Sequence, residues 1–157
     1  MRIGWHSLAL FLWAAIPRYL SGPFEAQLHM NDRRPRHLLL IDDEDDIREV
    51  AGLSLEMTQG WTITTANGGA AGIAVAESCT PDAILLDVMM PDMDGAGTLR
   101  VLQSQEATKT IPVIFLTAKV QAADRESFLR LGVRGIIAKP FDPLTVGAQI
   151  NALLAWS

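Results

Sequence analysis

From residue 37 onward, the chain alternates short runs of apolar or β-branched residues with segments that have helical spacing. Each run is only four or five residues long, which is typical of strands buried on both faces of a parallel sheet. The five runs are residues 37–41, 61–65, 83–86, 112–116 and 135–138. Helices are predicted for residues 44–58, 68–79, 96–106, 121–131 and 143–156. Because β–α–β connections are right-handed, this alternation predicts an α/β fold with a doubly wound, five-stranded parallel sheet.

Local signals mark the ends of several predicted helices. Gly132 follows the fourth helix, where glycine commonly ends a helix. Asp142 suits the N-cap of the fifth helix, and Pro143 suits its first position. The apolar stripe of the first helix, which has the spacing of a face that packs on a core, consists of Ile47, Val50, Ala51 and Leu55.

Residues 1–36 differ from the rest of the chain. They carry five Arg and two acidic residues, and residues 8–16 form an unbroken apolar run. This run is too short for a membrane span, which needs about 20 residues. Three interpretations stay open: a signal-peptide core, an amphipathic anchor, or a segment that is not normally translated. We favour the third, with translation from Met30 and a compact domain over residues 37–157.

The predicted domain is acidic. Residues 37–157 contain eight Lys or Arg and sixteen Asp or Glu, a formal balance of −8. An acidic domain without a basic stripe is a poor candidate for direct nucleic-acid binding. The single cysteine, Cys79, excludes an intrachain disulfide, and no Cys/His cluster suggests zinc. The composition thus argues against direct nucleic-acid binding and against a zinc site.

Polar residues follow four of the five predicted strands. Asp42 and Asp43 follow the first strand, Asp87 the third, Thr117 the fourth and Lys139 the fifth. Ligands of open α/β sheets bind outside the carboxyl ends of the strands. In the flavodoxin-like strand order 2-1-3-4-5, the first and third strands are neighbours. The three Asp side chains are therefore expected to converge.

Three carboxylates held close together need a counter-charge. A divalent cation with oxygen ligands, most simply Mg²⁺, would supply it. Such a cation would also cancel the repulsion between Asp87 and a phosphoryl group and would orient an in-line transfer. Lys139 would add a positive charge for the phosphoryl oxygens, and Thr117 would add a hydroxyl donor.

Each of these residues also has a simpler explanation when it is taken alone. The pair Asp42 and Asp43 suits a helix N-cap, and Asp87 suits the start of a turn. Thr117 suits a strand end, and Lys139 suits a solvated surface position. The functional interpretation rests on their coincidence, because all of them fall at carboxyl ends of predicted strands.

Four motifs carry a resemblance to a known family. They are residues 40–46 (LIDDEDD), 84–95 (ILLDVMMPDMDG), 115–119 (FLTAK) and 138–141 (AKPF). In their order and spacing, these motifs closely resemble the receiver domains of two-component response regulators, the CheY-like family. The resemblance covers residues 37–156 and implies the same five-stranded fold.

The resemblance also implies roles for the acidic residues. Asp87 would be the phospho-acceptor, and Asp42 and Asp43 would be the acidic pair. Asp43, Asp87 and the backbone carbonyl of Met89 would hold Mg²⁺. These assignments follow from the family's motifs as they stand in this sequence.

Residues of the fourth and fifth strands are assigned in the same way. Thr117 and Lys139 would contact the phosphoryl group, and the peptide bond between Lys139 and Pro140 would be cis. Ile136 occupies the switch position, where family members commonly carry Tyr or Phe. We therefore expect the phosphorylation chemistry to be retained and the transmission of the signal to differ.

The resemblance implies a phosphohistidine donor, on a sensor histidine kinase or a histidine phosphotransfer protein, and a cytoplasmic location. It implies no enzymatic activity beyond self-phosphorylation and slow autodephosphorylation. No output domain follows Trp156, so we expect a stand-alone receiver. Such a receiver would signal to a protein target through its changed surface or would pass the phosphoryl group on.

Other classes of protein fit the sequence less well. A pseudo-receiver, which binds proteins without being phosphorylated, is the main alternative, although the complete set of five site residues argues against it. A haloacid-dehalogenase-like phosphatase would need an acid at the position of Met89. A phosphotransfer protein would need a histidine in the middle of a helix, and none is predicted there.

Overall fold

The computed structural model describes residues 34–118 and 121–156. Within them, five parallel strands form one sheet in the order β2-β1-β3-β4-β5. The strands are β1 (His37–Ile41), β2 (Thr62–Ala66), β3 (Ala83–Asp87), β4 (Val113–Thr117) and β5 (Gly135–Ala138). The helices are α2 (Asp45–Gln59), α3 (Gly69–Cys79), α4 (Gly95–Ser104), α5 (Ala122–Arg130) and α6 (Val146–Leu154). The predicted doubly wound α/β fold is confirmed.

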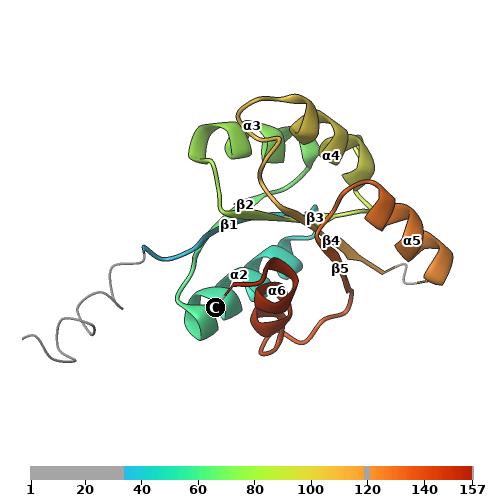
Figure 1. Cartoon of the computed structure of the whole chain (residues 1–157). Helices are drawn as coiled ribbons and strands as arrows, with labels where there is room; N and C mark the ends of the chain where they lie inside the picture. The colour runs from blue at the N-terminus through green and yellow to red at the C-terminus, as the bar shows by residue number, and fades with distance from the viewer. Residues whose placement is uncertain (1–33, 119–120, 157) are drawn as a thin grey trace, which may run out of the picture. The chain divides into compact units, whose positions relative to one another are not determined.

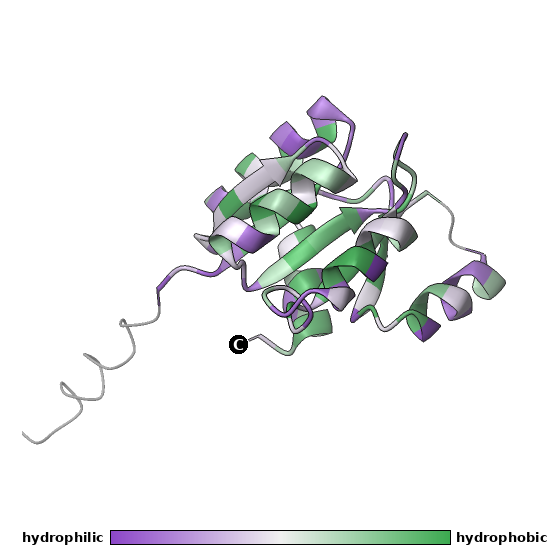
Figure 2. Cartoon of the chain, turned by 90° about the horizontal axis from the view of Figure 1, so that it is seen from above, coloured by the Kyte–Doolittle hydropathy of each residue, from purple (hydrophilic) through white to green (hydrophobic). Residues whose placement is uncertain are grey.

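Helices cover both faces of the sheet, with α2 and α6 on one face and α3, α4 and α5 on the other (Figure 1). Successive residues of the strands point to opposite faces, so Leu38 and Leu40 join one core and Leu39 and Ile41 join the other. Figure 2 shows a strongly hydrophobic centre of the sheet and helices in which hydrophobic and hydrophilic residues are mixed. Burial on both faces explains why β1, β3 and β4 are nearly continuous apolar runs, whereas the edge strand β2 contains exposed threonines.

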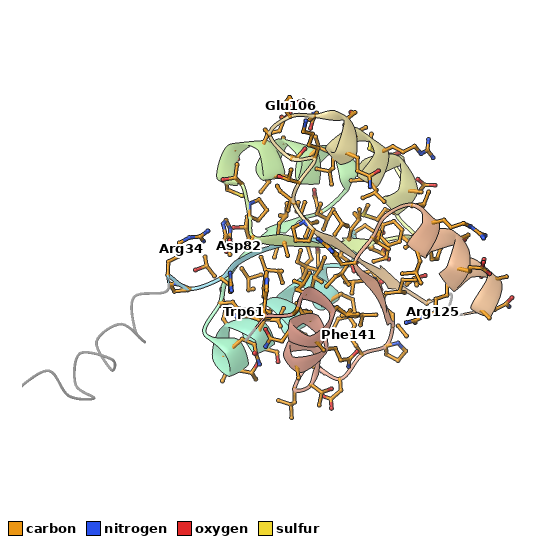
Figure 3. All side chains as sticks on the ribbon, viewed as in Figure 1. Arg34, Trp61, Asp82, Glu106, Arg125 and Phe141 are labelled. Carbon is orange, nitrogen blue, oxygen red and sulfur yellow. The ribbon has the colours of Figure 1, made fainter. Side chains whose placement is uncertain are left out.

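Aromatic contacts tie the ends of the domain together. Trp61 and Trp156 meet edge to face with ring centroids 5.4 Å apart, and the Arg36 guanidinium lies 4.7 Å from the Trp156 centroid. Figure 3 shows Trp61 and Phe141 on the side of the sheet that α2 and α6 cover. The segment after α6 (Val146–Leu154) therefore packs on the residues that directly precede β1 and β2.

The fifth predicted helix begins later than expected. α6 starts at Val146, and Thr145 is its N-cap. The Asp142 carboxylate accepts the N–H of Leu144 at 2.9 Å, and its carbonyl accepts the N–H groups of Thr145 and Val146. Asp142 and Pro143 thus form a turn before the helix, because Asp side chains stabilise turns as readily as helix starts.

The apolar stripe of the first helix was also only partly right. Ala51 and Leu55 are buried against the sheet, but Val50 is 51% exposed. The predicted leader, residues 1–36, lies almost entirely outside the described residues, so its three interpretations stay predictions. None of the helices in the described ranges is long and apolar enough to cross a membrane.

Candidate functional site

The three predicted carboxylates come together at the carboxyl edge of the sheet. Asp42 and Asp43 directly follow β1, and Asp87 ends β3, the strand hydrogen-bonded to β1. One carboxylate oxygen from each residue lies within 4.8 Å of the others. Asp42 is fully buried and Asp87 is 2% exposed, whereas Asp43 lies nearer the surface.

Lys139, which follows β5, places its ammonium group among carboxylates. Its Nζ lies 2.6 Å from Asp42 Oδ2, 3.1 Å from Glu44 Oε1 and 3.4 Å from Asp87 Oδ1. The peptide bond between Lys139 and Pro140 is cis, as the resemblance implied. The Lys139 side chain is only 10% exposed, so its ion pairs with the buried Asp42 and Asp87 are screened little by water, whereas the Glu44 side chain is 61% exposed.

Burial and charged neighbours shift the pKa values of both Asp87 and Lys139. Burial and the charge of Asp42 raise the pKa of Asp87 to about 6, although Lys139 and the Met89 N–H act in the opposite direction. Burial alone would lower the pKa of Lys139, but hydrogen bonds and charges from Asp42, Glu44 and Asp87 outweigh it and raise the pKa. The site therefore holds a firmly protonated lysine beside a carboxyl group that resists ionisation.

Backbone geometry fixes the position of Asp87. The Met89 N–H donates to Asp87 Oδ1 at 3.3 Å, and the Gly95 N–H donates to the Val88 carbonyl at 3.0 Å. The Asp94 carboxylate accepts the Gly97 N–H at 2.7 Å and so caps α4. These hydrogen bonds hold the loop between β3 and α4 in a tight turn and keep the start of α4 next to the residue that follows Asp87.

Thr117 and Ile136 lie on the two strands beyond β3. Thr117 ends β4 and is fully buried, and its carbonyl accepts the Lys139 N–H at 2.9 Å. Ile136 on β5 is 6% exposed and pairs in register with Phe115 of β4. Phe115 in turn meets Phe128 of α5 edge to face, with ring centroids 5.4 Å apart. Ile136 and Phe115 thus lie in the same packed layer between the sheet and α5.

Sequence reasoning missed the contact between Glu44 and Lys139. These residues are 95 positions apart, and helix and strand spacing carries no information about such a pair. The only available signal was that Glu44 directly follows the acidic pair at the end of a predicted strand. Arg48, which donates to the carbonyl of Asp42 at 2.7 Å, was also missed, because a hydrogen bond to a backbone carbonyl leaves no residue pattern in the sequence.

The residues present fit a hard divalent cation. Asp42 Oδ2 is buried and, within the described ranges, has no hydrogen bond of regular geometry, although the Lys139 ammonium pairs with it. Among the described residues, three carboxylates also outnumber the one lysine that pairs with them. An all-oxygen set of this kind suits Mg²⁺, which is commonly bound by one or two carboxylates and water.

Comparison with protein families gives one match over most of the chain. The model described as "Response regulator receiver domain" matches residues 38–151. Among curated relatives, "Probable transcriptional regulatory protein TcrX" of Mycobacterium tuberculosis is 39% identical over 123 residues, covering 78% of this chain and 51% of that protein. The "Alkaline phosphatase synthesis transcriptional regulatory protein PhoP" of Bacillus subtilis is 35% identical over 119 residues, covering 76% and 48%. The chain thus spans about half the length of the curated relatives it matches.

Solved structures give the same fold. The chemotaxis protein CheY4 of Vibrio cholerae superposes with a TM-score of 0.71 at 27% identity, over 76% of this chain and 99% of that chain. A response regulator receiver domain from Francisella superposes with a TM-score of 0.69 at 27% identity, over 76% and 97%. Sequence and structure comparisons therefore agree on the same region and the same fold.

Proposed function

We propose, from the premise that this chain belongs to the family of response regulator receiver domains, that it accepts a phosphoryl group on Asp87. The donor would be a phosphohistidine on a sensor histidine kinase or a histidine phosphotransfer protein. The observation that carries the proposal is the convergence of Asp42, Asp43 and Asp87 within 4.8 Å beside a buried lysine. The phosphorylated domain would then signal through its changed surface or pass the phosphoryl group on.

The proposed Mg²⁺ ligands are the carboxylates of Asp43 and Asp87 and the backbone carbonyl of Met89. Asp42 completes the acidic pair. Bound Mg²⁺ would reduce the charge repulsion between the Asp87 carboxylate and an incoming phosphoryl group. The support for this assignment is the excess of carboxylate charge in a site that is largely buried.

The remaining steps belong to the side chains of this chain. An Asp87 carboxylate oxygen attacks the phosphorus, a P–O bond forms, and the P–N bond to the donor imidazole breaks. The imidazole keeps the bonding electron pair and takes up a proton. Lys139 and Thr117 are proposed to bind phosphoryl oxygens, because both lie at strand ends beside Asp87 and offer a charge-assisted and a hydroxyl hydrogen bond.

An exposed apolar surface beside the site is suited to docking of the donor. Leu144 is 74% exposed and follows Pro143, whose carbonyl accepts a hydrogen bond from Ser54 of α2. The exposed apolar side chains of α2, which share one face of the helix, are Val50, Leu53 and Met57. Because α2 starts directly after the acidic pair, a helical donor resting on this face would present its phosphohistidine to Asp87.

Phosphorylation by a small donor tests the chemistry. With acetyl phosphate and Mg²⁺, intact-mass measurement is expected to show one added phosphoryl group on the wild-type protein. Asp87→Asn, or an excess of EDTA, is expected to abolish the addition. Equal labelling of Asp87→Asn would assign the acceptor elsewhere, and no labelling of the wild-type protein would favour the pseudo-receiver alternative.

A second measurement tests the docking surface. Leu53→Lys is expected to slow transfer from a phosphorylated histidine phosphotransfer domain about tenfold, since exposed apolar contacts at such interfaces contribute about 1–2 kcal/mol. Labelling by acetyl phosphate, which needs no docking, should not change. Leu129→Lys, at a 44% exposed position on α5, is the matched control. If both variants behave alike with the protein donor, the α2 face is not the docking surface.

A further inference from the structure

Glu44 stands at the N-cap of α2 but does not cap the helix. Its side chain makes no capping hydrogen bond, although N-cap side chains usually accept one from the first turn. Its backbone N–H donates to Asp42 Oδ1 at 3.0 Å, which fixes the residue at the edge of the site. Its carboxylate reaches across to Lys139 instead, with Oε1 3.1 Å from Nζ. The position of the Glu44 side chain is therefore explained by its contact with Lys139 and not by helix capping.

Lys139 has three carboxylate partners, and they are not equivalent. Asp42 and Asp87 belong to the carboxylate cluster, which in the described ranges consists of these two residues and Asp43. With a divalent cation in the cluster, their charge is shared between the cation and the lysine. Glu44 lies outside the cluster and keeps its full charge for Lys139. In the metal-loaded protein, Glu44 thus still competes for the ammonium group, beside the closer Asp42.

We propose that Glu44 is a positioning residue that holds Lys139 in the unphosphorylated protein and competes with the phosphoryl group for it. This inference rests on the proposed function of Asp87. The Lys139 ammonium group already lies near both the Glu44 carboxylate, at 3.1 Å, and Asp87, the proposed phosphorylation site, at 3.4 Å. The long lysine side chain needs only a small rotation to exchange one anion for the other. Glu44 therefore sets how tightly the phosphoryl group is held.

Beryllofluoride, a phosphoryl mimic, tests the competition without any turnover. Its affinity is measured at saturating Mg²⁺ in the wild-type protein and in Glu44→Gln, which removes the charge. Binding is expected to tighten by about two- to fivefold, the range expected for loss of a half-exposed ion pair. Asp46→Asn removes the same charge from an exposed position in the same helical turn and should leave the affinity unchanged.

Glu44→Asp separates direct contact from general charge. It keeps the negative charge but is one methylene shorter, and aspartate is a favoured N-cap, so the fold is expected to be retained. If Glu44 acts by contacting Lys139, this variant binds beryllofluoride as tightly as Glu44→Gln does. Its Mg²⁺ affinity, measured without the mimic, should equal that of the wild type.

Three results would overturn the inference. These are equal beryllofluoride affinity in all four proteins, weaker binding in Glu44→Gln, or wild-type affinity in Glu44→Asp together with tighter binding in Glu44→Gln. The last result would mean that Glu44 acts only through its charge. Failure of the wild-type protein itself to bind beryllofluoride with Mg²⁺ would instead contradict the proposed function.

Discussion

Gly95 lies so close to Asp87 that a Cβ atom at Gly95 would be 2.6 Å from the Asp87 carbonyl oxygen. The same atom would be 2.8 Å from the Cα atom of Val88. Both contacts are with backbone, which cannot rotate away as a side chain can. The close approach of α4 to the residue after the third strand therefore depends on glycine at this position.

Gly95→Ala is expected to lower the free energy of unfolding by about 1–3 kcal/mol, the range for overpacked sites. The matched control is Gly52→Ala inside α2, where a Cβ would lie 3.7 Å from Ile63. That change is expected to raise stability by about 0.5–1 kcal/mol, because alanine favours helices. Denaturant unfolding measures both. Equal stability of Gly95→Ala and the wild type would show that the loop can relax.

The ionisation of Asp87 should destabilise the metal-free protein. Its pKa is raised from 3.8 to about 6, chiefly by burial and then by the charge of Asp42. A raised acid pKa means that the native state favours the protonated form, so stability falls as the pH rises from about 4 through about 6. In EDTA near pH 8, Asp87→Asn should be more stable than the wild type by up to about 3 kcal/mol.

Thermal melts across this pH range check the sign. The advantage of Asp87→Asn is expected to shrink as the pH falls and to vanish below about pH 4, where the wild-type carboxyl group is protonated in both folded and unfolded states. An Asn variant that is less stable near pH 8 would show that the ion pair with Lys139 outweighs the burial of Asp87.

The domain boundary gives a further prediction. Within the part of the chain that the structure describes, both apolar cores are built from residues between Leu38 and Trp156. A chain of residues 30–157 is therefore expected to fold and to bind Mg²⁺ as well as the full chain does. Thermal melts of the two proteins should agree, and a loss of several degrees on truncation would place the boundary earlier.

The ends of β1, β3 and β4 were predictable because these three strands are buried on both faces and stop at or directly before a polar residue, whereas the edge strand β2 is partly exposed. Asp42 and Asp87 could be brought together from the strand order alone, since parallel neighbours end at the same edge. The start of α6 was not predictable, because Asp142 and Pro143 suit a turn as well as a helix start. The exposure of Val50 depends on how α2 packs, which helical spacing does not specify.

The side-chain partners within the site could not be predicted from the sequence, for a different reason. Lys139 was expected to bind a phosphoryl group, but in the structure it pairs with Asp42, Glu44 and Asp87 at once. Such partners are set by three-dimensional distances between distant loops, and the choice among three carboxylates is electrostatic. The sequence identified which groups gather at the site, and the structure adds which of them are in contact.

The position of Ile136 gives the last prediction. In the family an aromatic residue at this position moves inward when the threonine turns toward the phosphoryl group. Here Ile136 is already 6% exposed and lies opposite Phe115, whose ring packs on Phe128 of α5. A β-branched side chain is stiff at χ1 and has no hydroxyl group. Because a ligand shifts an equilibrium only through differential contacts, the shift at Ile136 should be small.

Amide chemical shifts on addition of Mg²⁺ and beryllofluoride should therefore change strongly near Asp87 and Thr117 and only modestly around Ile136 and the helix after it. Ile136→Tyr should enlarge the distal changes, since the larger ring can occupy two positions with different exposure. Its beryllofluoride affinity should stay within a few-fold of the wild type, because Ile136 is not among the proposed phosphoryl contacts. If the distal changes in the wild type already match those of the Tyr variant, isoleucine acts as a full switch residue, and the weaker coupling expected here is wrong.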